Sequence, residues 1–189
     1  MKKLITLILF FLVYSLSYGQ EPKNILIAYY SKTGNTKLLA DAVAKGAKSV
    51  SGIQLIIKTI EQTTHKDLLR ADAIIIGSPV HNANAAPEVV KFMSEWPFAG
   101  NPLKDKIGAA FVTAGGISAG EELVQVNLLH SMMIFGMVVV GGDNWTSAFG
   151  ASAITGEEVY QNKKQMDSLF TQKGYSLGKR VAELCKKMN

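Results

Sequence analysis

Five short, almost unbroken apolar runs alternate along this chain with segments whose apolar residues recur at helical spacing. The runs cover residues 24–30, 53–60, 73–77, 107–113 and 137–140. The helical patterns cover residues 36–50, 87–96, 119–135 and 166–187, with weak interruptions expected at Gly174 and Gly178 and a short helix or turn at 65–70. Because apolar residues on both sides of a strand indicate burial of both faces, this alternation predicts a parallel sheet covered by helices.

The expected fold is an α/β, doubly wound, five-stranded parallel sheet with helices on both faces. Right-handed crossovers leave few topologies, and 2-1-3-4-5 is the common five-stranded order. In that order the ligand-binding switch point lies between the first and third strands. Small and polar residues fill the loops after the first, third and fourth strands, at 31–36, 78–84 and 114–118. We expect these three loops to converge on one ligand, and residues 141–156 to form a long loop.

The first of these loops has the composition of a phosphate-binding loop. It reads Ser31-Lys32-Thr33-Gly34-Asn35-Thr36. Backbone N–H groups and the positive end of the following helix favour an anion here, and Gly34 permits a backbone shape that larger residues resist. Neither the Walker pattern nor G-x-G-x-x-G occurs in it, which favours a mononucleotide monophosphate over a triphosphate or a dinucleotide. The alternative is an ordinary polar βα loop rich in turn residues.

The first 19 residues have the pattern of a secretory signal. Lys2 and Lys3 precede an apolar run at 4–13, and small residues end at Gly19. We therefore expect a signal peptide at 1–19, one domain at 20–189 and a periplasmic location. Because the apolar run is short for a span of about 20 residues, anchoring to the inner membrane by an uncleaved segment is the alternative. That segment is the only membrane contact expected.

Composition excludes several classes of function. Removing residues 1–19 takes away Lys2 and Lys3 and lowers the formal charge from +5 to +3. The remaining lysines are scattered, and no basic stripe with interleaved aromatic residues predicts a nucleic-acid partner. Cys185 is the only cysteine, so no internal disulfide can form, and its helical neighbours predict a buried, structural thiol. The sequence indicates no metal ligands and no separate catalytic acid.

The motifs resemble the flavodoxin-like superfamily. Residues 31–36 resemble the flavodoxin phosphate signature [ST]-x-T-G-x-T. Three further stretches are similar to the WrbA-like NAD(P)H:quinone oxidoreductases, close to the NADPH-dependent FMN reductases. These stretches are Ser78-Pro79-Val80-His81-Asn82-Ala83-Asn84, Phe149-Gly150-Ala151-Ser152 and residues 174–182. The resemblance covers residues 24–187. It departs at Phe135, where that family has a histidine, and at His81 and Asn82, where it has arginine and phenylalanine.

The resemblance implies FMN as the cofactor. It places residues 31–36 around the phosphate and residues 79–84 along the isoalloxazine ring. It places a third group of residues beside the ribityl chain and the far edge of the ring, namely Thr113, Ala114, Gly115 and Gly116. Trp145 and Phe149 either wall the site or fill the long loop's own core. His81 stacks on the flavin in one interpretation and is an ordinary loop histidine in the other.

Three functions follow as hypotheses. The first is an exported FMN oxidoreductase that reduces quinones or similar acceptors with two electrons from NAD(P)H or another donor. The second is a one-electron carrier of the flavodoxin type, although such carriers are usually acidic and this chain is mildly basic. The third is a binding module that has lost its flavin. Small-molecule donors and acceptors are the expected partners, and a homo-oligomer is possible because WrbA-like proteins form tetramers.

Overall fold

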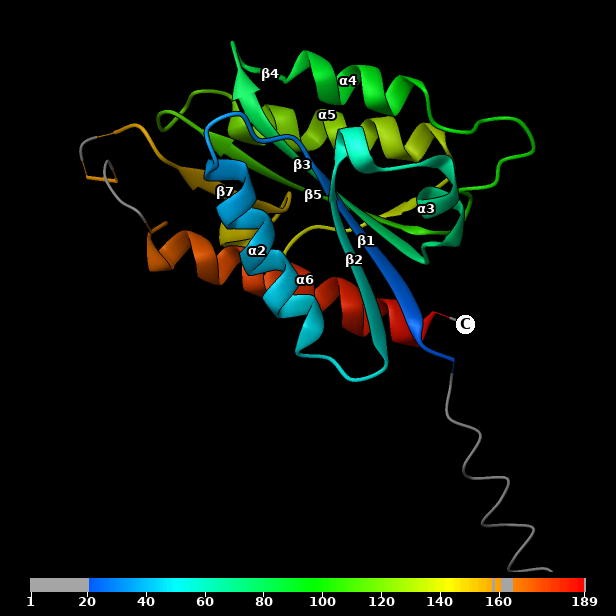
Figure 1. Cartoon of the computed structure of the whole chain (residues 1–189). Helices are drawn as coiled ribbons and strands as arrows, with labels where there is room; N and C mark the ends of the chain where they lie inside the picture. The colour runs from blue at the N-terminus through cyan, green and yellow to red at the C-terminus, as the bar shows by residue number, and fades with distance from the viewer. Residues whose placement is uncertain (1–20, 158, 161–164, 189) are drawn as a thin grey trace, which may run out of the picture.

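The computed structural model describes residues 21–157, 159–160 and 165–188, and Figure 1 shows their arrangement. The predicted signal peptide at 1–19 lies outside the described residues. Within the described ranges, no helix has the length and apolar character needed to cross a bilayer.

A parallel sheet forms the centre of the molecule. Its strands are β1 (Lys23–Tyr29), β2 (Ile53–Thr59), β3 (Ala73–His81), β5 (Ile107–Ala114), β6 (Val138–Val139) and β7 (Ala151–Ile154). The order is β2-β1-β3-β5-β6, which confirms the predicted 2-1-3-4-5 arrangement. The short strand β4 (Asn84–Ala85) pairs with β3 in the antiparallel direction. The carboxyl ends of β1, β3 and β5 therefore lie next to one another at one edge of the sheet.

Helices cover both faces of this sheet (Figure 1). α2 (Asn35–Lys48) and α6 (Ser168–Lys187) pack on the face that carries Ile25, Ile27 and Ile75. The opposite face, with Leu26, Ile74 and Ile76, is covered by α3 (His65–Arg70), α4 (Pro87–Ser94) and α5 (Glu121–Ile134). Successive strand residues point to opposite faces, so apolar side chains along the whole strand build two cores. Two single-turn 3₁₀ helices, η1 (Ile60–Gln62) and η2 (Trp145–Ser147), complete the elements.

Two strand predictions were wrong in extent. β3 continues through Ser78 to His81 and turns back into β4, so residues 78–84 form a hairpin rather than an open loop. The fifth position of the sheet is divided between β6 and β7, both parallel to β5. The predicted long loop at 141–156 therefore contains β7 at its end, and the sheet has more strands than the expected five. β7 has only four residues, which is too short to show a period in the sequence.

The α6 helix runs without a break through Gly174 and Gly178, contrary to the expected weak interruptions. A Cβ atom at Gly178 would lie 1.9 Å from the carbonyl oxygen of Val43, and one at Gly46 would lie 1.9 Å from that of Tyr175. The glycines therefore permit the α2 and α6 backbones to touch. Cys185, 2% exposed, is buried on the same helix, as predicted, and burial raises the pKa of its thiol to about 11.

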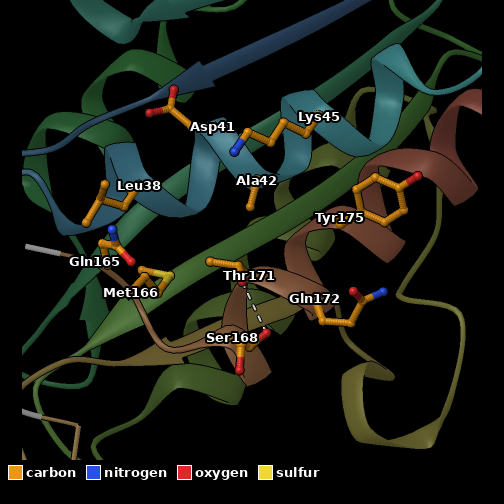
Figure 2. Close-up of a pocket in the computed structure, with 10 residues that line it drawn as sticks. All are labelled: Leu38, Asp41, Ala42, Lys45, Gln165, Met166, Ser168, Thr171, Gln172 and Tyr175. Atoms are coloured by element: carbon orange, nitrogen blue, oxygen red, sulfur yellow. Dashed lines mark hydrogen bonds between the residues drawn. The ribbon is translucent and has the colours of Figure 1, made fainter. Parts of the chain in front are cut away.

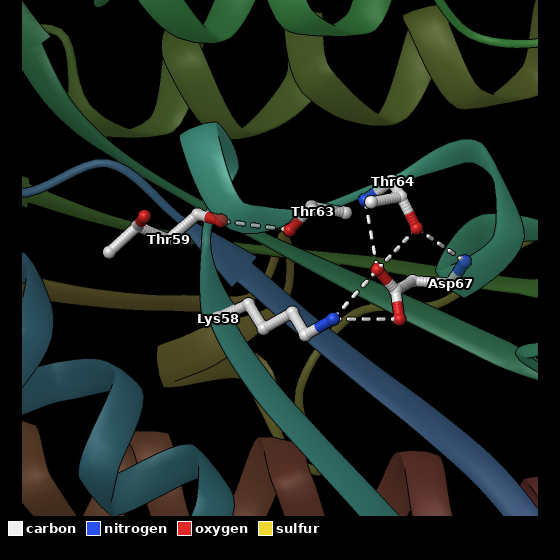
Figure 3. A network of polar contacts seen from close by, with 5 residues as sticks. All are labelled: Lys58, Thr59, Thr63, Thr64 and Asp67. Atoms are coloured by element: carbon white, nitrogen blue, oxygen red, sulfur yellow. Dashed lines mark hydrogen bonds and ion pairs between the residues drawn. The ribbon is translucent and has the colours of Figure 1, made fainter.

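A polar network closes the edge of the sheet at α3 (Figure 3). Nζ of Lys58 donates to both carboxylate oxygens of Asp67 at 2.9 Å. The backbone N–H and the hydroxyl of Thr64 donate to Oδ2 of Asp67 at 2.9 and 2.7 Å, which completes a capping box. Burial acts against ionisation, but the hydrogen bonds from Lys58 and Thr64 outweigh it and lower the pKa of Asp67 from 3.8 to about 2.

We expect replacement of Asp67 by asparagine to lower the free energy of unfolding by about 1–2 kcal/mol at pH 7, discounted for solvent screening. Because the folded pKa lies below 3.8, the ionised carboxylate stabilises the fold above that pH. This contribution is lost as the pH falls through about 2. Urea unfolding of the wild type and of Asp67→Asn at pH 7 and pH 2 measures the cost of the substitution and its loss at low pH. Asp41→Asn, which breaks the exposed pair with Lys37, is the control and should cost about 0.5 kcal/mol or less.

Candidate functional site

The three predicted loops lie together at the carboxyl edge of the sheet. The first loop, residues 31–36, follows β1. The second is the hairpin formed by β3 and β4, and the third, residues 115–120, follows β5. A buried hydrogen bond of 2.9 Å between the side-chain oxygens of Thr36 and Thr113 joins the first loop to the third. Both threonines are almost fully buried, so this link is fixed by packing as well as by the hydrogen bond. The expected convergence of the loops is thus present.

The first loop has the backbone features that an anion needs. Gly34 caps α2 in the left-handed region at φ 93°, and a Cβ at this glycine would meet no atom within 4 Å. Within the described ranges, no acceptor contacts the backbone N–H groups of Thr33, Gly34 or Asn35. These donors are therefore unpaired at the positive end of the 14-residue helix α2. The loop fits a phosphate group.

Side chains hold this loop in shape. The hydroxyl of Ser31 accepts a hydrogen bond from the backbone N–H of Lys37 at 3.2 Å. Nδ2 of Asn35 donates to Oγ1 of Thr155 at 3.1 Å, and that hydroxyl donates to the carbonyl oxygen of Ala114 at 3.2 Å. Thr155 thus bridges the first and third loops. Lys32 and Thr33 are exposed and free to approach a bound anion.

The second loop is a hairpin with an unusual turn. Asn82 and Ala83 both have positive φ angles, 49° and 60°, between β3 and β4. Ala83 packs closely on Gly120, where a Cβ would lie 2.8 Å from the Cα of Ala83. The buried hydroxyl of Ser78 accepts from the backbone N–H of Ala86 at 3.0 Å and donates to the carbonyl oxygen of Pro79 at 2.8 Å. The predicted contacts Pro79, Val80, His81 and Asn84 therefore lie on a hydrogen-bonded β-hairpin.

The third loop begins inside β5. Thr113 and Ala114 are buried residues of β5. The space beside Gly115 is empty, because a Cβ atom built at this glycine would meet no atom within 4 Å. The carboxylate of Glu157 accepts from the backbone N–H of Ile117 at 2.6 Å and lies against Gly116. Glu157 holds the loop edge in place. Thr155 and Glu157 were missed by sequence reasoning, because they fell in a segment with no periodic pattern.

Tyr30 and Glu88 form a hydrogen-bonded pair close enough to the hairpin for its His81 to act on the Glu88 carboxylate. The Tyr30 hydroxyl donates to Oε1 of Glu88 at 2.9 Å, which raises the pKa of Tyr30. The pKa of Glu88 is lowered first by a hydrogen bond from its own backbone and then by Tyr30, with smaller effects of His81 and Lys32. Tyr30 and Glu88 were also missed, since Tyr30 was assigned to the first strand. His81 is exposed at this rim.

Other residues singled out in the sequence lie elsewhere. His130 is exposed on α5, and Trp145 is 88% exposed, so Trp145 does not fill a core of its own loop. Within the described ranges, no group of three or more metal-ligating side chains is present. A cavity of about 700 Å³ lies between α2 and the start of α6 (Figure 2). None of the predicted cofactor contacts lines this cavity.

Comparison with known proteins agrees with this geometry. Residues 59–152 match the family described as NADPH-dependent FMN reductase. A protein named flavodoxin from Aquifex aeolicus (strain VF5) is 30% identical over 169 residues, covering 84% of this chain and 85% of the relative.

Two solved structures are similar in fold. A flavodoxin, WrbA-like protein from Agrobacterium tumefaciens superposes with a TM-score of 0.72 at 20% identity, covering 88% of this chain and 99% of that one. A flavodoxin from the domain Archaea superposes with a TM-score of 0.68 at 26% identity, covering 86% and 99%. The aligned parts thus span nearly the whole of each compared structure.

Proposed function

The chain belongs to the flavodoxin family, and from this premise we propose that it is a reductase which passes two electrons to a quinone-type acceptor. It is an FMN-binding oxidoreductase or electron carrier, and FMN is its cofactor. When bound, FMN supplies the hydride or electron chemistry. The observation that carries the reductase assignment is the match to NADPH-dependent FMN reductases over residues 59–152, which include the second and third loops.

The residues of the three loops would hold the cofactor. Free N–H groups of Thr33, Gly34 and Asn35 would donate to the phosphate, where each hydrogen bond to a charged group contributes about 1.5–3 kcal/mol. The hairpin that includes residues 79–84 would support the ring, and the open backbone at Gly115, next to Gly116, would face its far edge. No side chain at the rim is assigned as a catalytic acid.

A one-electron carrier is the second candidate. It is supported by the names of the relatives, because the proteins of Aquifex aeolicus and Clostridium saccharobutylicum are both called flavodoxin. The mildly basic charge argues against it, since acidic carriers are steered to basic partners. The flavin-less module is set aside, because FMN is the cofactor of this chain.

We further propose that the protein is exported, by a signal at 1–19 that is cleaved or serves as an inner-membrane anchor, leaving one domain at 20–189. NADPH is not expected to be available outside the cytoplasm, so the physiological donor there would be a membrane quinol or a partner protein. A homo-oligomer is also proposed, by resemblance to the WrbA-like family.

The test is a turnover assay with the FMN-loaded protein. We expect NADPH or NADH to be oxidised when a soluble benzoquinone is present, with at least tenfold less turnover by protein stripped of FMN. Anaerobic titration with a reductant should convert the oxidised spectrum directly into the fully reduced one. Absence of turnover across a panel of donors and quinones, with a third spectrum persisting at half reduction, would replace the reductase with the carrier.

A further inference from the structure

A second cavity, with a volume of about 330 Å³, lies between α4 and α5 on the face of the sheet opposite α2 and α6. We refer to it as the α4–α5 groove. Val90 is 55% exposed and Ile134 72%, so both walls are reached from solvent. The rest of the lining is apolar or neutral. It consists of Asn84, Ala85, Met93, Ser94, Asn127, Leu128, Ser131 and Phe135.

The groove is elongated along the two helices. Asn127, Ser131 and Ile134 are four and three residues apart on α5, so they form one row along that helix. Val90 and Ser94 are four residues apart and form the facing row on α4. The row on α5 spans about 10 Å at the rise of an α-helix. An occupant of this groove is therefore a narrow, extended group.

One end of the groove is the hairpin of the proposed flavin site. Asn84 and Ala85 of β4 line the groove, and Figure 1 shows β4 beside the start of α4. Asn84 is the register partner of His81 in the hairpin, and its Nδ2 donates to the carbonyl oxygen of Asn82 at 2.9 Å. Asn84 thus belongs both to the groove and to the residues predicted to contact FMN. A molecule at the flavin ring lies next to the groove entrance.

The lining favours a neutral, apolar occupant. Among the described residues, no charged side chain lines the groove, and α5 has no acidic residue, lysine or arginine from position 123 to 135. The hydroxyl of Ser94 donates to the carbonyl oxygen of Lys91 at 2.7 Å, and that of Ser131 to the carbonyl oxygen of Asn127 at 3.0 Å. These hydroxyls are satisfied within their own helices, so a hydrocarbon beside them leaves no donor unpaired.

The volume restricts the occupant to a single chain. It is about twice that of an engineered cavity of about 150 Å³ that holds one benzene ring, so it has room for about ten carbon atoms. A partner helix is about 10–12 Å across with its side chains and would rest on the surface rather than enter. Grooves with exposed apolar walls and a polar rim are typical ligand sites.

We propose that the α4–α5 groove binds the isoprenoid side chain of a lipid-soluble quinone whose ring lies at the flavin hairpin. This inference rests on the proposed reductase function, because it names the substrate class of that site. The side chain would make apolar contacts away from the reacting ring. These contacts are the same before and during the reaction, so they lower KM and leave kcat almost unchanged.

The test compares two quinones that share one dimethoxy-methyl benzoquinone ring. One carries a geranyl side chain, and the other carries a methyl group in its place. With the FMN-loaded full chain and NADPH or NADH as donor, we expect KM for the geranyl quinone to be at least about tenfold lower. Burial of about two CH₂ groups supplies such a factor. Equal KM values, with turnover of both quinones, would overturn the groove assignment and leave the reductase proposal standing.

A binding measurement covers the case in which neither quinone is reduced. That result would reject both compounds as substrates and with them the proposed function. Saturation-transfer NMR then decides whether the groove holds the chain. We expect transfer from the protein to the geranyl protons of the quinone, and loss of that transfer in the groove variants below. No transfer to these protons in the wild type would overturn the groove assignment as well.

Lysine substitutions test the groove from both helices. Ile134→Lys on α5 and Val90→Lys on α4 each place an ammonium group against the chain, and each should reduce the ratio of the two KM values to about twofold or less. Met133→Lys is the matched control and should keep a ratio of about tenfold or more. Met133 is 56% exposed on the same helix but does not line the groove.

The ratio is taken within each variant, so a general loss of activity does not imitate the effect. If Met133→Lys lowers the ratio as much as Ile134→Lys does, the geranyl chain adheres to the apolar surface of α5 at large. That outcome, like an unchanged ratio in both groove variants, contradicts binding in the groove.

Discussion

Replacing Gly34 by valine should weaken FMN binding at least 100-fold. At φ 93° a β-branched residue is strained, so the loop must change its backbone conformation. The free N–H groups of Thr33, Gly34 and Asn35 would then no longer point to one phosphate. Loss of two hydrogen bonds to a charged group, at about 1.5–3 kcal/mol each, corresponds to an affinity loss of about 100-fold or more. Quenching of FMN fluorescence on binding measures the dissociation constant.

Gly100→Val is the matched control for this experiment. Gly100 also has a positive φ, 79°, and a Cβ there would likewise meet no atom within 4 Å. It lies in the connection after α4, away from the three loops. Both variants carry similar backbone strain, so only Gly34→Val should change the affinity. If the two variants bind FMN equally well, the loop at 31–36 does not hold the phosphate.

The sheet and the convergence of three loops at its carboxyl edge could be predicted from the sequence because both depend on local patterns. Apolar runs such as 24–30 and 73–77 mark strands buried on both faces, and the order of the strands follows from handed crossovers. The loop at 31–36 is recognisable for the same reason, since its hydroxyls, its glycine and the following helix are contiguous. The same pattern placed Thr36 at the start of the following helix, where the structure has it.

The parts that were missed depend on contacts between distant segments. Thr155 bridges Asn35 and Ala114, and Glu157 holds Ile117, but no spacing rule connects residues that are 40 to 120 positions apart. The hairpin at 78–85 was read as a loop because Ser78 and Pro79 interrupt the apolar pattern of β3. The division of the last strand into β6 and β7 was hidden because each piece is too short to show a period.

Contacts between distant segments also explain why the interruptions expected at Gly174 and Gly178 are absent from α6. In sequence, Gly174 and Gly178 look like weak points, because glycine is unfavourable in a helix by about 0.5–1 kcal/mol relative to alanine. In the structure, Gly178 allows the α6 backbone to contact α2 at Val43. Intrinsic propensity and tertiary packing therefore predict opposite signs for the same substitution.

We expect Gly178→Ala to destabilise the protein by about 1–3 kcal/mol, despite the better helix propensity of alanine. Its Cβ would lie 1.9 Å from the Val43 carbonyl oxygen, and because this is backbone, α2 and α6 must separate. At Gly174 the nearest atoms would be Cδ1 of Leu39 at 3.0 Å and Cβ of Ala42 at 3.1 Å, and the nearest backbone oxygen, that of Leu39, would lie 3.4 Å away. Because this overlap is much smaller than at Gly178, Gly174→Ala should change stability by at most about 1 kcal/mol. Urea unfolding of both variants measures the difference. Equal stability of the two would show that the α2–α6 contact is not limited by backbone approach, and that helix propensity alone decides the effect.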